Sequence, residues 1–416
     1  RRMGWRGLML DADLLRENTL ILRAHAKELL TRIPFVDENT TPAARKKFDE
    51  ACVTAGVPPP TTRAQKSEEW EKWLETYGEK VPWAPAVADY QRVNRMLKLY
   101  ETLDKRKLTN GRFSYGKKYA GAHTLRWSGG DGFNMENLNR DELHGTDIRN
   151  VFIAGPGKRL IGSDLSQIEP RVLAWRAGET DFLDLCRKGI SPYVAHGLMT
   201  GRVEDAGAFE KARKVKGSDE AHAYSGLKAE VLLLGYGGGA ETFLRSAKVY
   251  GIDTDLLNAK RIVTAFRDGR PKVVGLWREL EREWRMAYSC GHNPILLPLP
   301  SGRHLRYFNP RITDREAHAR TSLDARLPSK IYGGLLTENW VQASARDVLA
   351  DMLLRLSRYD WLTPLMTVHD EILFEVDDHR ADEGLALVKK EMSTPPAWAP
   401  DLPVDCDSAL IECYTK

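Results

Sequence analysis

Two aspartates occupy positions where the chain is expected to be rigid. Asp164 ends an apolar run at residues 160–164 that is typical of a short buried strand, and Asp370 lies between apolar runs at residues 365–368 and 372–376 that are typical of a hairpin. Carboxylates fixed on a sheet can share divalent cations, and Mg²⁺ takes one or two of them and completes its shell with substrate phosphates and water. Each aspartate alone is equally consistent with a surface acid at a strand end or a turn.

A second set of residues has the spacing of a nucleotide-binding helix face. Lys228, Leu232 and Tyr236 recur at every fourth position, so a helix over residues 225–236 would present an ammonium, an apolar surface and an aromatic ring on one side. The glycine-rich run at residues 235–239 follows this helix. Because a helix C-terminus repels phosphate and no GK[ST] follows, we interpret these glycines as a helix stop and hinge rather than a phosphate loop.

The segment at residues 104–126 is basic and contains aromatic residues. Seven Lys and Arg residues are opposed by one acid, and Phe113, Tyr115 and Tyr119 lie among them. Cations for phosphates and rings for stacking are what a nucleic-acid groove needs, although a solvated basic loop has the same composition. The whole chain carries a net charge of only +4, which by itself indicates no polyanionic partner.

The elements that must position these residues form three blocks along the 416 residues. Residues 11–103 have helical periodicity with one Pro-rich interruption at residues 58–62, and residues 180–274 are again mainly helical. Short strands punctuated by proline follow residue 291. We therefore expect an α+β protein of two to four domains, with a core sheet that begins near residue 160.

The composition excludes several classes of protein. Hydrophobic residues make up 42% and charged residues 29% of the chain, and no apolar run approaches the ~18 residues that span a bilayer, so we expect no membrane insertion. Five cysteines without a CxxC pair indicate neither a disulfide framework nor a zinc ribbon, and favour a reducing compartment. The chain begins at Arg1 and shows no signal segment, so we expect a domain of a longer protein.

Three motifs in order resemble the polymerase motifs of family A DNA polymerases. They are residues 162–171 (GSDLSQIEPR), 228–237 (KAEVLLLGYG) and 368–371 (VHDE). Four further stretches are similar to the bacteriophage branch of that family, namely residues 121–129 (GAHTLRWSG), 299–307 (LPSGRHLRY), 332–347 (YGGLLTENWVQASARD) and 398–404 (WAPDLPV). The resemblance covers most of the chain from residue 111 to the end.

The resemblance implies a right-hand polymerase fold of the α+β class, with a helical thumb, an antiparallel-sheet palm and helical fingers. The thumb would be residues 1–110, and the first part of the palm, with the first motif, residues 111–178. The fingers, with the nucleotide-binding helix, would be residues 179–292, and the second part of the palm, with the third motif, residues 293–416. No exonuclease domain is expected, because the acids Asp11 and Asp13 lie at a helix start, where capping is the simpler role.

The resemblance also implies a catalytic and metal site. Asp164, Asp370 and the backbone carbonyl of Leu165 would hold two Mg²⁺ ions, with Mn²⁺ able to replace them, and Glu371 would lie near the primer end. Lys228 would bind the triphosphate of the incoming nucleotide as part of the catalytic set.

Further nucleotide and DNA contacts follow from the same motifs. The nucleotide-binding positions implied besides Lys228 are Gln167, Glu169, Leu232 and Tyr236. Glu169 would be the steric gate against a ribose 2′-hydroxyl, and the Tyr236 hydroxyl would be its hydrogen-bond partner. Tyr236 would also stack near the templating base. The DNA-binding positions implied are Arg126, Gln342 and His369 in the minor groove, and Lys117, Lys118 and Arg112 in the basic segment.

The activity implied is template-directed extension of a DNA primer with dNTPs, in phage DNA replication in the cytoplasm of a bacterial host. Its partners would be primer-template DNA, dNTPs and other replication proteins, with no membrane. An RNA polymerase or reverse transcriptase on the same palm is the alternative enzyme, and Glu169 argues against it. A catalytically silent nucleic-acid-binding scaffold is the alternative outside enzymes.

The chain departs from the family pattern at Tyr224, which stands where the family usually has an arginine. Arg213, Lys214 and Lys216 lie too far upstream of Tyr224 in the chain to be assigned to that position.

Overall fold

The computed structural model describes residue 3 and residues 6–37, 40–63, 67–138, 141–323 and 325–415. The chain divides into two compact units, each built from separate stretches of sequence. The first unit comprises residues 1–116, 130–160 and 411–416, and the second comprises residues 117–129 and 161–410. Within the described residues, no helix is both long and apolar enough to cross a membrane.

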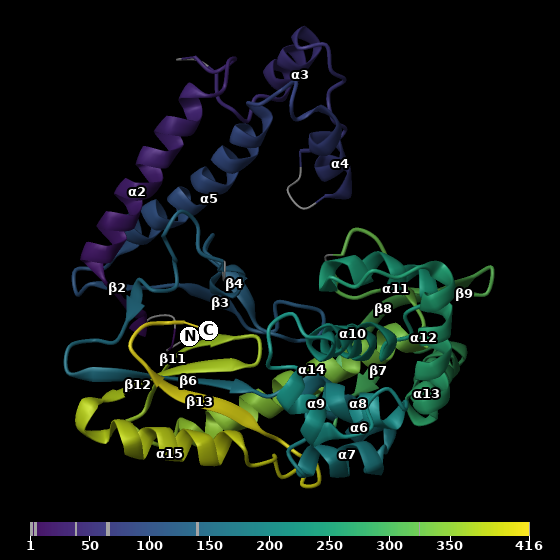
Figure 1. Ribbon diagram of the computed structural model, residues 1–416. Helices are drawn as coiled ribbons and strands as arrows, with labels where there is room; N and C mark the ends of the chain where they lie inside the picture. The colour runs from purple at the N-terminus through teal and green to yellow at the C-terminus, as the bar shows by residue number, and fades with distance from the viewer. Residues whose placement is uncertain are drawn as a thin grey trace. The chain divides into compact units, whose positions relative to one another are not determined.

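The first unit contains a helical arm and a small sheet (Figure 1). Its helices are α2 (Ala12–Thr31), α3 (Arg45–Thr54), α4 (Glu68–Tyr77) and α5 (Ala84–Arg106). Its antiparallel sheet has the order β2 (Arg112–Phe113), β1 (Leu8–Leu10) and β5 (Phe152–Ile153), and a short 3-10 helix, η1 (Met135–Asn137), belongs to the same unit.

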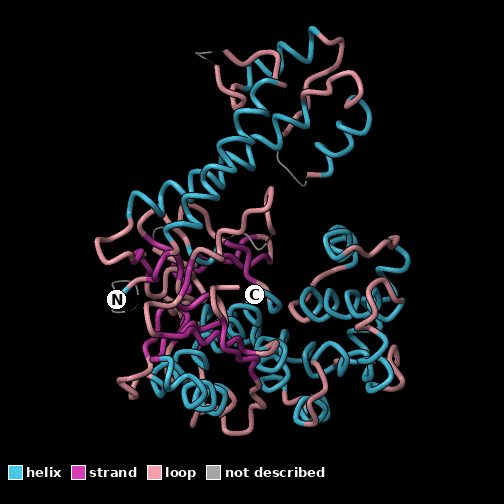
Figure 2. Tube along the Cα trace, turned by 60° about the vertical axis from the view of Figure 1, so that its left-hand side comes forward, coloured by secondary structure: helices cyan, strands magenta, loops and turns pink. Residues whose placement is uncertain are grey.

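Two long helices of this unit, α2 and α5, pack side by side along their lengths (Figure 2). Asp11 caps α2 by accepting hydrogen bonds from the backbone N–H groups of Asp13 at 3.1 Å and Leu14 at 3.0 Å, which confirms the capping role expected from the sequence. Between the helices, the Asn18 side chain donates to the Tyr100 hydroxyl at 3.1 Å, and burial raises the pKa of Tyr100 to about 12.

The core of the second unit is a four-stranded sheet with the order β11 (Thr363–Val368), β12 (Glu371–Asp377), β6 (Lys158–Leu165) and β13 (Cys406–Ile411). The pair β11 and β12 is the antiparallel hairpin that the two apolar runs predicted. Burial alternates along β6, whereas β12 is buried at every position up to Val376, as a central strand covered on both faces would be. The α+β class expected from the sequence is confirmed.

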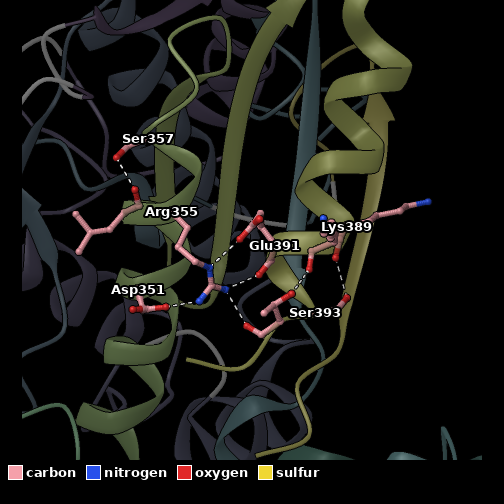
Figure 3. Close-up of polar contacts among 9 residues, drawn as sticks. Asp351, Arg355, Ser357, Lys389, Glu391 and Ser393 are labelled. Carbon is pink, nitrogen blue, oxygen red and sulfur yellow. Dashed lines mark hydrogen bonds and ion pairs between the residues drawn. The ribbon is translucent and has the colours of Figure 1, made fainter. Parts of the chain in front are cut away.

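Helices α14 (Gly333–Leu356) and α15 (Ala381–Met392) pack on this sheet and on each other. Figure 3 shows the polar contacts that join them: Arg355 on α14 donates from Nε to the Glu391 carboxylate at 2.8 Å and from Nη2 to the Glu391 and Thr394 carbonyls at 2.7 and 2.8 Å. Asp351, one turn before Arg355, forms an ion pair with the same guanidinium. One side chain therefore fixes the C-terminal ends of both helices.

The second unit also contains the helical block expected between residues 180 and 274. Its helices are α6 (Ile168–Ala177), α7 (Thr180–Arg187), α8 (Pro192–Met199), α9 (Ala206–Ala212), α10 (Asp219–Leu234), α11 (Ala240–Ala247), α12 (Leu256–Gly269) and α13 (Pro271–Ser289), with the 3-10 turn η2 (Lys248–Tyr250). Arg270 and Glu179 form a buried ion pair within it, and the guanidinium also lies 4.3 Å from the centre of the Phe182 ring.

A second antiparallel sheet follows α13, as the Pro-punctuated strands predicted. Its strand order is β10 (Ser329–Ile331), β9 (Glu316–Arg320), β8 (His304–Thr313) and β7 (Ile295–Pro298). The short strands β3 (Gly116–Lys118) and β4 (Ser128–Gly130) pair with each other as a two-stranded sheet.

Candidate active site

The structure brings Asp164 and Asp370 together at one end of the main sheet of the second unit. The backbone N–H of Leu165, the last residue of β6, donates a hydrogen bond to the carbonyl of Asp370 at 3.1 Å. Both aspartates are partly exposed, whereas Glu371 is only 5% exposed. Two carboxylates that are far apart in the sequence therefore lie at the same end of the main sheet, one on β6 and one in the turn before β12.

The turn that carries Asp370 is tight and supported from both sides. Val368 and Glu371 are paired across the hairpin, so only His369 and Asp370 form the loop, and His369 has a left-handed φ of +51° and an exposed side chain. Lys117 donates from Nζ to the Thr367 hydroxyl at 2.6 Å and also to the Thr367 carbonyl. The structure thus places Lys117 against the hairpin that carries Asp370, whereas the sequence suggested a contact with DNA.

The start of α6 brings Glu169 beside the aspartate strand. Gln167 precedes the helix in a left-handed conformation, with φ of 46° and ψ of 54°, and Glu169 lies in the first helical turn. The Glu169 carboxylate forms an ion pair with the Arg126 guanidinium. The expectation that the Tyr236 hydroxyl would be its partner is not met, because the guanidinium supplies charge-assisted hydrogen bonds that a neutral hydroxyl cannot match.

A half-buried polar cluster surrounds Arg126. Burial raises the pKa of Tyr236, nearby Glu338 raises it further, and Arg126 opposes both. Burial likewise raises the pKa of Glu338, against the effects of Arg126 and of the Gln342 side chain, which donates to Glu338 at 3.1 Å. Arg126, Tyr236 and Gln342 therefore all lie near Glu338. Glu338 was missed by the sequence analysis, although it lies one helical turn before Gln342.

The end of α10 is corrected by the structure. The helix ends at Leu234, so Tyr236 lies beyond it rather than on its face with Lys228 and Leu232. The glycines end the helix as interpreted: Gly235 is the C-cap and Gly237 has a φ of +81°. The Trp277 indole donates to the Gly235 carbonyl at 2.9 Å, which takes the place of a further helical bond.

Two glycines at the start of α14 allow the backbones to meet around Tyr236. A Cβ at Gly334 would lie 2.0 Å from the Tyr236 carbonyl oxygen, and a Cβ at Gly333 would lie 2.1 Å from the Trp277 carbonyl oxygen. Only glycine fits at such separations. The motif at residues 332–347 thus begins with a packing requirement that positions Tyr236.

Helix α10 presents Lys228 to solvent one turn after Tyr224. Leu232 packs against an apolar cluster that includes Tyr193, whose ring meets that of Tyr224 edge-on at 5.6 Å. The Arg213 guanidinium lies 4.0 Å from the centre of the Tyr224 ring. The turn after α9 therefore brings Arg213 against Tyr224, although the two residues are separated along the chain.

The other two basic residues predicted to contact DNA, Lys118 and Arg112, lie in different units of the chain. Lys118 is exposed beside Lys117 in the second unit. Arg112 belongs to the first unit, where its Nη1 donates to the Gly7 carbonyl at 3.1 Å.

The metal-binding potential of the site rests on oxygen donors. Among the described residues, no group of three or more His, Cys, Asp and Glu side chains could hold a metal ion. The candidate set of Asp164, Asp370 and the Leu165 carbonyl supplies two carboxylates and a carbonyl. This set fits Mg²⁺, which takes few protein ligands, and does not fit zinc, which takes His and Cys.

Known proteins that are similar to this chain are DNA polymerases. No protein-family model matches the chain. The chain is 30% identical to the DNA polymerase of Bacillus phage SP02 over 298 residues, which are 65% of this chain and 43% of that protein. It is 24% identical to the thermostable DNA polymerase I of Thermus filiformis over 418 residues, covering 97% of this chain and 45% of that protein. The chain thus spans less than half the length of these relatives.

A solved structure has the same fold. The POL domain of Pol1 from M. smegmatis, in a complex with DNA primer-template and dNTP, superimposes with a TM-score of 0.73 at 17% sequence identity. The match covers 99% of this chain and 68% of that chain. The polymerase-domain fold expected from the sequence motifs is confirmed by this match.

Proposed function

We propose that this chain, whose homologues are DNA polymerases of family A, extends the 3′ end of a DNA primer with dNTPs under the direction of a template strand. The observation that carries the proposal is the hydrogen bond between the Leu165 N–H and the Asp370 carbonyl, because it sets both aspartates at the same end of the main sheet. Two carboxylates held in this way would suit the two divalent metal ions that nucleotidyl transfer uses.

Asp164, Asp370 and the Leu165 carbonyl would hold two Mg²⁺ ions, or Mn²⁺ in their place. Bound there, the ions would favour ionisation of the primer 3′-hydroxyl and stabilise the charge on the triphosphate and the leaving pyrophosphate. The protein keeps both carboxylates in place through the buried strands β6, β11 and β12. Glu371, 5% exposed beside Asp370, would lie near the primer end.

The triphosphate would be bound by cations on and beside α10. Lys228 is exposed on this helix, and Arg213 is held against the Tyr224 ring one turn earlier. Positive charge from both side chains would oppose the charge that develops during phosphoryl transfer. Leu232 would contact the incoming base and sugar, Tyr236 would stack near the templating base, and Gln167 would contact the nucleotide from the start of α6.

The sugar and the minor groove would be read by the polar cluster around Arg126. Glu169, held by Arg126, would fill the space that a ribose 2′-hydroxyl needs. Arg126, Gln342 and His369 would donate to minor-groove acceptors that all base pairs present, and so test shape rather than sequence. Lys117, bonded to Thr367, would position the hairpin, and Lys118 and Arg112 would contact the DNA backbone.

We also propose the division into thumb (1–110), palm (111–178 and 293–416) and fingers (179–292) that the motifs imply. The similarity to a Bacillus phage polymerase favours a role in phage DNA replication in the cytoplasm of a bacterial host, alongside other replication proteins.

Primer extension by the purified chain tests the proposal. With Mg²⁺, we expect extension of a DNA primer on a DNA template with dNTPs, and far weaker extension with rNTPs. Preference for rNTPs would identify an RNA polymerase, and preference for an RNA template a reverse transcriptase. Binding of primer-template without extension under any of these conditions would identify a silent scaffold and refute the proposal.

A further inference from the structure

A second polar site lies in the second unit, in a cavity that the site described above does not use. The cavity has a volume of about 780 Å³. Three segments line it: residues 119–125 from the basic stretch, residues 303–308 at the start of β8, and residues 321–323 after β9. The walls include Tyr119, two arginines and two histidines but no carboxylate.

The rim of this cavity carries an aromatic ring that is exposed and yet held in place. Tyr119 is 72% exposed, and the guanidinium of Arg346 lies 4.7 Å from the centre of its ring. The same guanidinium lies 4.6 Å from the centre of the Trp127 ring. A hydrogen bond with Arg346 lowers the pKa of Tyr119, with a smaller contribution from Arg303. An exposed ring fixed by cations is an arrangement suited to stacking.

Arg346 is itself immobilised by a buried acid. Arg346 donates from Nη1 to Asp347 Oδ1 at 3.0 Å, and only 4% of each side chain is exposed. Ser301 donates a hydrogen bond to the other carboxylate oxygen, and Arg303 Nε lies 3.4 Å from Oδ1. One carboxylate is thus shared by two guanidiniums, so the local charge remains positive.

The remaining charge in the cavity belongs to β8. Arg306 is exposed and forms no ion pair or side-chain hydrogen bond among the described residues, and His304 beside it is exposed too. The planar guanidinium matches the geometry of a phosphate oxygen pair. Two arginines and no acid on the walls therefore favour an anion with phosphate chemistry.

His123 lines another part of the cavity and adds no charge to it. The ring of His123 is hydrogen-bonded through Nδ1 to the Thr321 carbonyl at 2.8 Å and meets the Tyr307 ring edge-on at 5.1 Å. Burial lowers the pKa of His123. The imidazole therefore stays neutral and joins the basic stretch to the end of β9.

We propose that this cavity is a DNA subsite that binds one backbone phosphodiester, with Arg303 and Arg306 on the phosphate and the Tyr119 ring against the adjoining sugar and base. The subsite rests on the proposed function, and it adds a contact beyond the primer end and the incoming nucleotide. A phosphodiester in a duplex and one in a single-stranded template have the same chemistry, so the test must separate them.

Fluorescence anisotropy of labelled DNA, without dNTPs and over a series of salt concentrations, measures the contact directly. The two probes are a blunt duplex and the same duplex with a single-stranded template overhang. The variants are Arg306→Gln and Tyr119→Ala. Arg311→Gln is the matched control, because Arg311 is an exposed arginine on the same strand that does not line the cavity. Tyr119→Phe tests whether the ring suffices.

We expect Arg306→Gln to weaken binding by about 3- to 10-fold and to reduce the magnitude of the salt slope by about one, as loss of one phosphate contact does. Tyr119→Ala should weaken binding by at least about fivefold with an unchanged slope, and Tyr119→Phe should bind like the wild type. Losses on both probes identify the duplex as the source of the phosphodiester, and losses only on the overhang probe identify the single strand.

Unchanged affinity and slope in Arg306→Gln and Tyr119→Ala would overturn the subsite, as would an equal loss in Arg311→Gln. A raised KM for dNTP with unchanged DNA affinity would also overturn it, by assigning the cavity to the nucleotide. Primer extension by the wild type, measured alongside, separates the two claims. An inactive wild type refutes the proposed function, whereas an active wild type with unaffected variants refutes the subsite alone.

Discussion

The carboxylate of Glu169 is paired with Arg126. Substitution of Glu169 alone therefore tests whether this carboxylate discriminates between dNTP and rNTP. In the proposed site, removal of the carboxylate in Glu169→Ala would open the volume beside the C2′ atom of the incoming nucleotide. We expect the preference for dNTP over rNTP to fall by on the order of 10- to 100-fold, equivalent to ~1.4 to 2.8 kcal/mol in the transition state. The measurement is kcat/KM for dCTP and rCTP opposite template dG.

Tyr236→Phe is the matched control for this prediction. Because the partner of Glu169 is Arg126, loss of the Tyr236 hydroxyl should leave the sugar preference within about twofold of the wild type. An unchanged preference in Glu169→Ala, or an equal loss in Tyr236→Phe, would show that sugar discrimination does not reside in the Glu169 carboxylate.

Residue types and motif order predicted which side chains gather at the site, but not which ones bind each other. Asp164 and Asp370 were found because each is flanked by apolar strands, a pattern that is local in the sequence. The pairing of Glu169 with Arg126 and the stacking of Arg213 on Tyr224 depend on side-chain reach across separate elements. Periodicity carries no information on such contacts.

At the scale of elements, the junction between α10 and α14 depends on a glycine. Gly334→Ala would place a methyl group 2.0 Å from the Tyr236 carbonyl oxygen, so one backbone must move. We expect the free energy of unfolding to fall by about 1–3 kcal/mol and kcat/KM for dNTP to fall by at least about tenfold, because Tyr236 shifts with the backbone. Urea denaturation and primer extension measure the two effects.

Gly275→Ala is the control for a glycine without this contact. Gly275 lies inside α13, and a Cβ there meets no atom within 4 Å. Alanine favours the helix, so stability should stay unchanged or rise by up to about 1 kcal/mol, with normal activity. Full activity in Gly334→Ala would contradict the role of the close approach.

The helices α8, α10 and α12 enclose a histidine that should make stability depend on pH. His196 is fully buried, its Nε2 lies 3.1 Å from Glu230 Oε2, and its ring packs on Phe266. Burial lowers the pKa of His196, Glu230 opposes this effect, and Arg270 and Arg202 add to it. The folded protein therefore keeps the imidazole neutral at pH values where the unfolded chain protonates it.

The direction of this dependence follows from the two protonation states. The stabilisation is complete above the pKa of an unfolded histidine, about 6.5, and is lost as the pH falls below it, by at most ~1.4 kcal/mol per pH unit. His196→Gln retains an N–H donor toward Glu230 but does not titrate. Urea denaturation at pH 5.5 and pH 7.0 should give a smaller difference in unfolding free energy for His196→Gln. Equal differences would exclude His196 as a source of the pH dependence.

Secondary structure could be predicted where it depends on the local sequence alone. The hairpin with an acid at its tip and the stop of α10 at its glycines were both expected from the sequence. The exact end of α10, two residues before Tyr236, was not predicted, because the Trp277 bond to Gly235 comes from another helix. Tertiary hydrogen bonds of this kind decide helix ends but leave no periodic signal.

At the scale of the whole molecule, the two compact units are discontinuous in sequence. Residues 130–160 and 411–416 belong with the helical arm, and residues 117–129 belong with the main sheet. Motif order predicted the fold class, which depends on the sequence of elements. Motif order could not predict which separate stretches of sequence join the same unit, because long-range pairings such as the bridge between Ile153 and Cys413 determine this.

The account as a whole depends on the two aspartates acting as one metal-binding unit. Single-turnover primer extension with Mg²⁺ tests this dependence when wild type, Asp164→Asn and Asp370→Asn are compared at saturating DNA and dNTP. Because either substitution removes half of the bridge without changing side-chain size, each variant should lose at least about a thousandfold in rate, or ~4 kcal/mol, while binding primer-template within about threefold of the wild type. Near-normal extension by either variant would contradict the central claim.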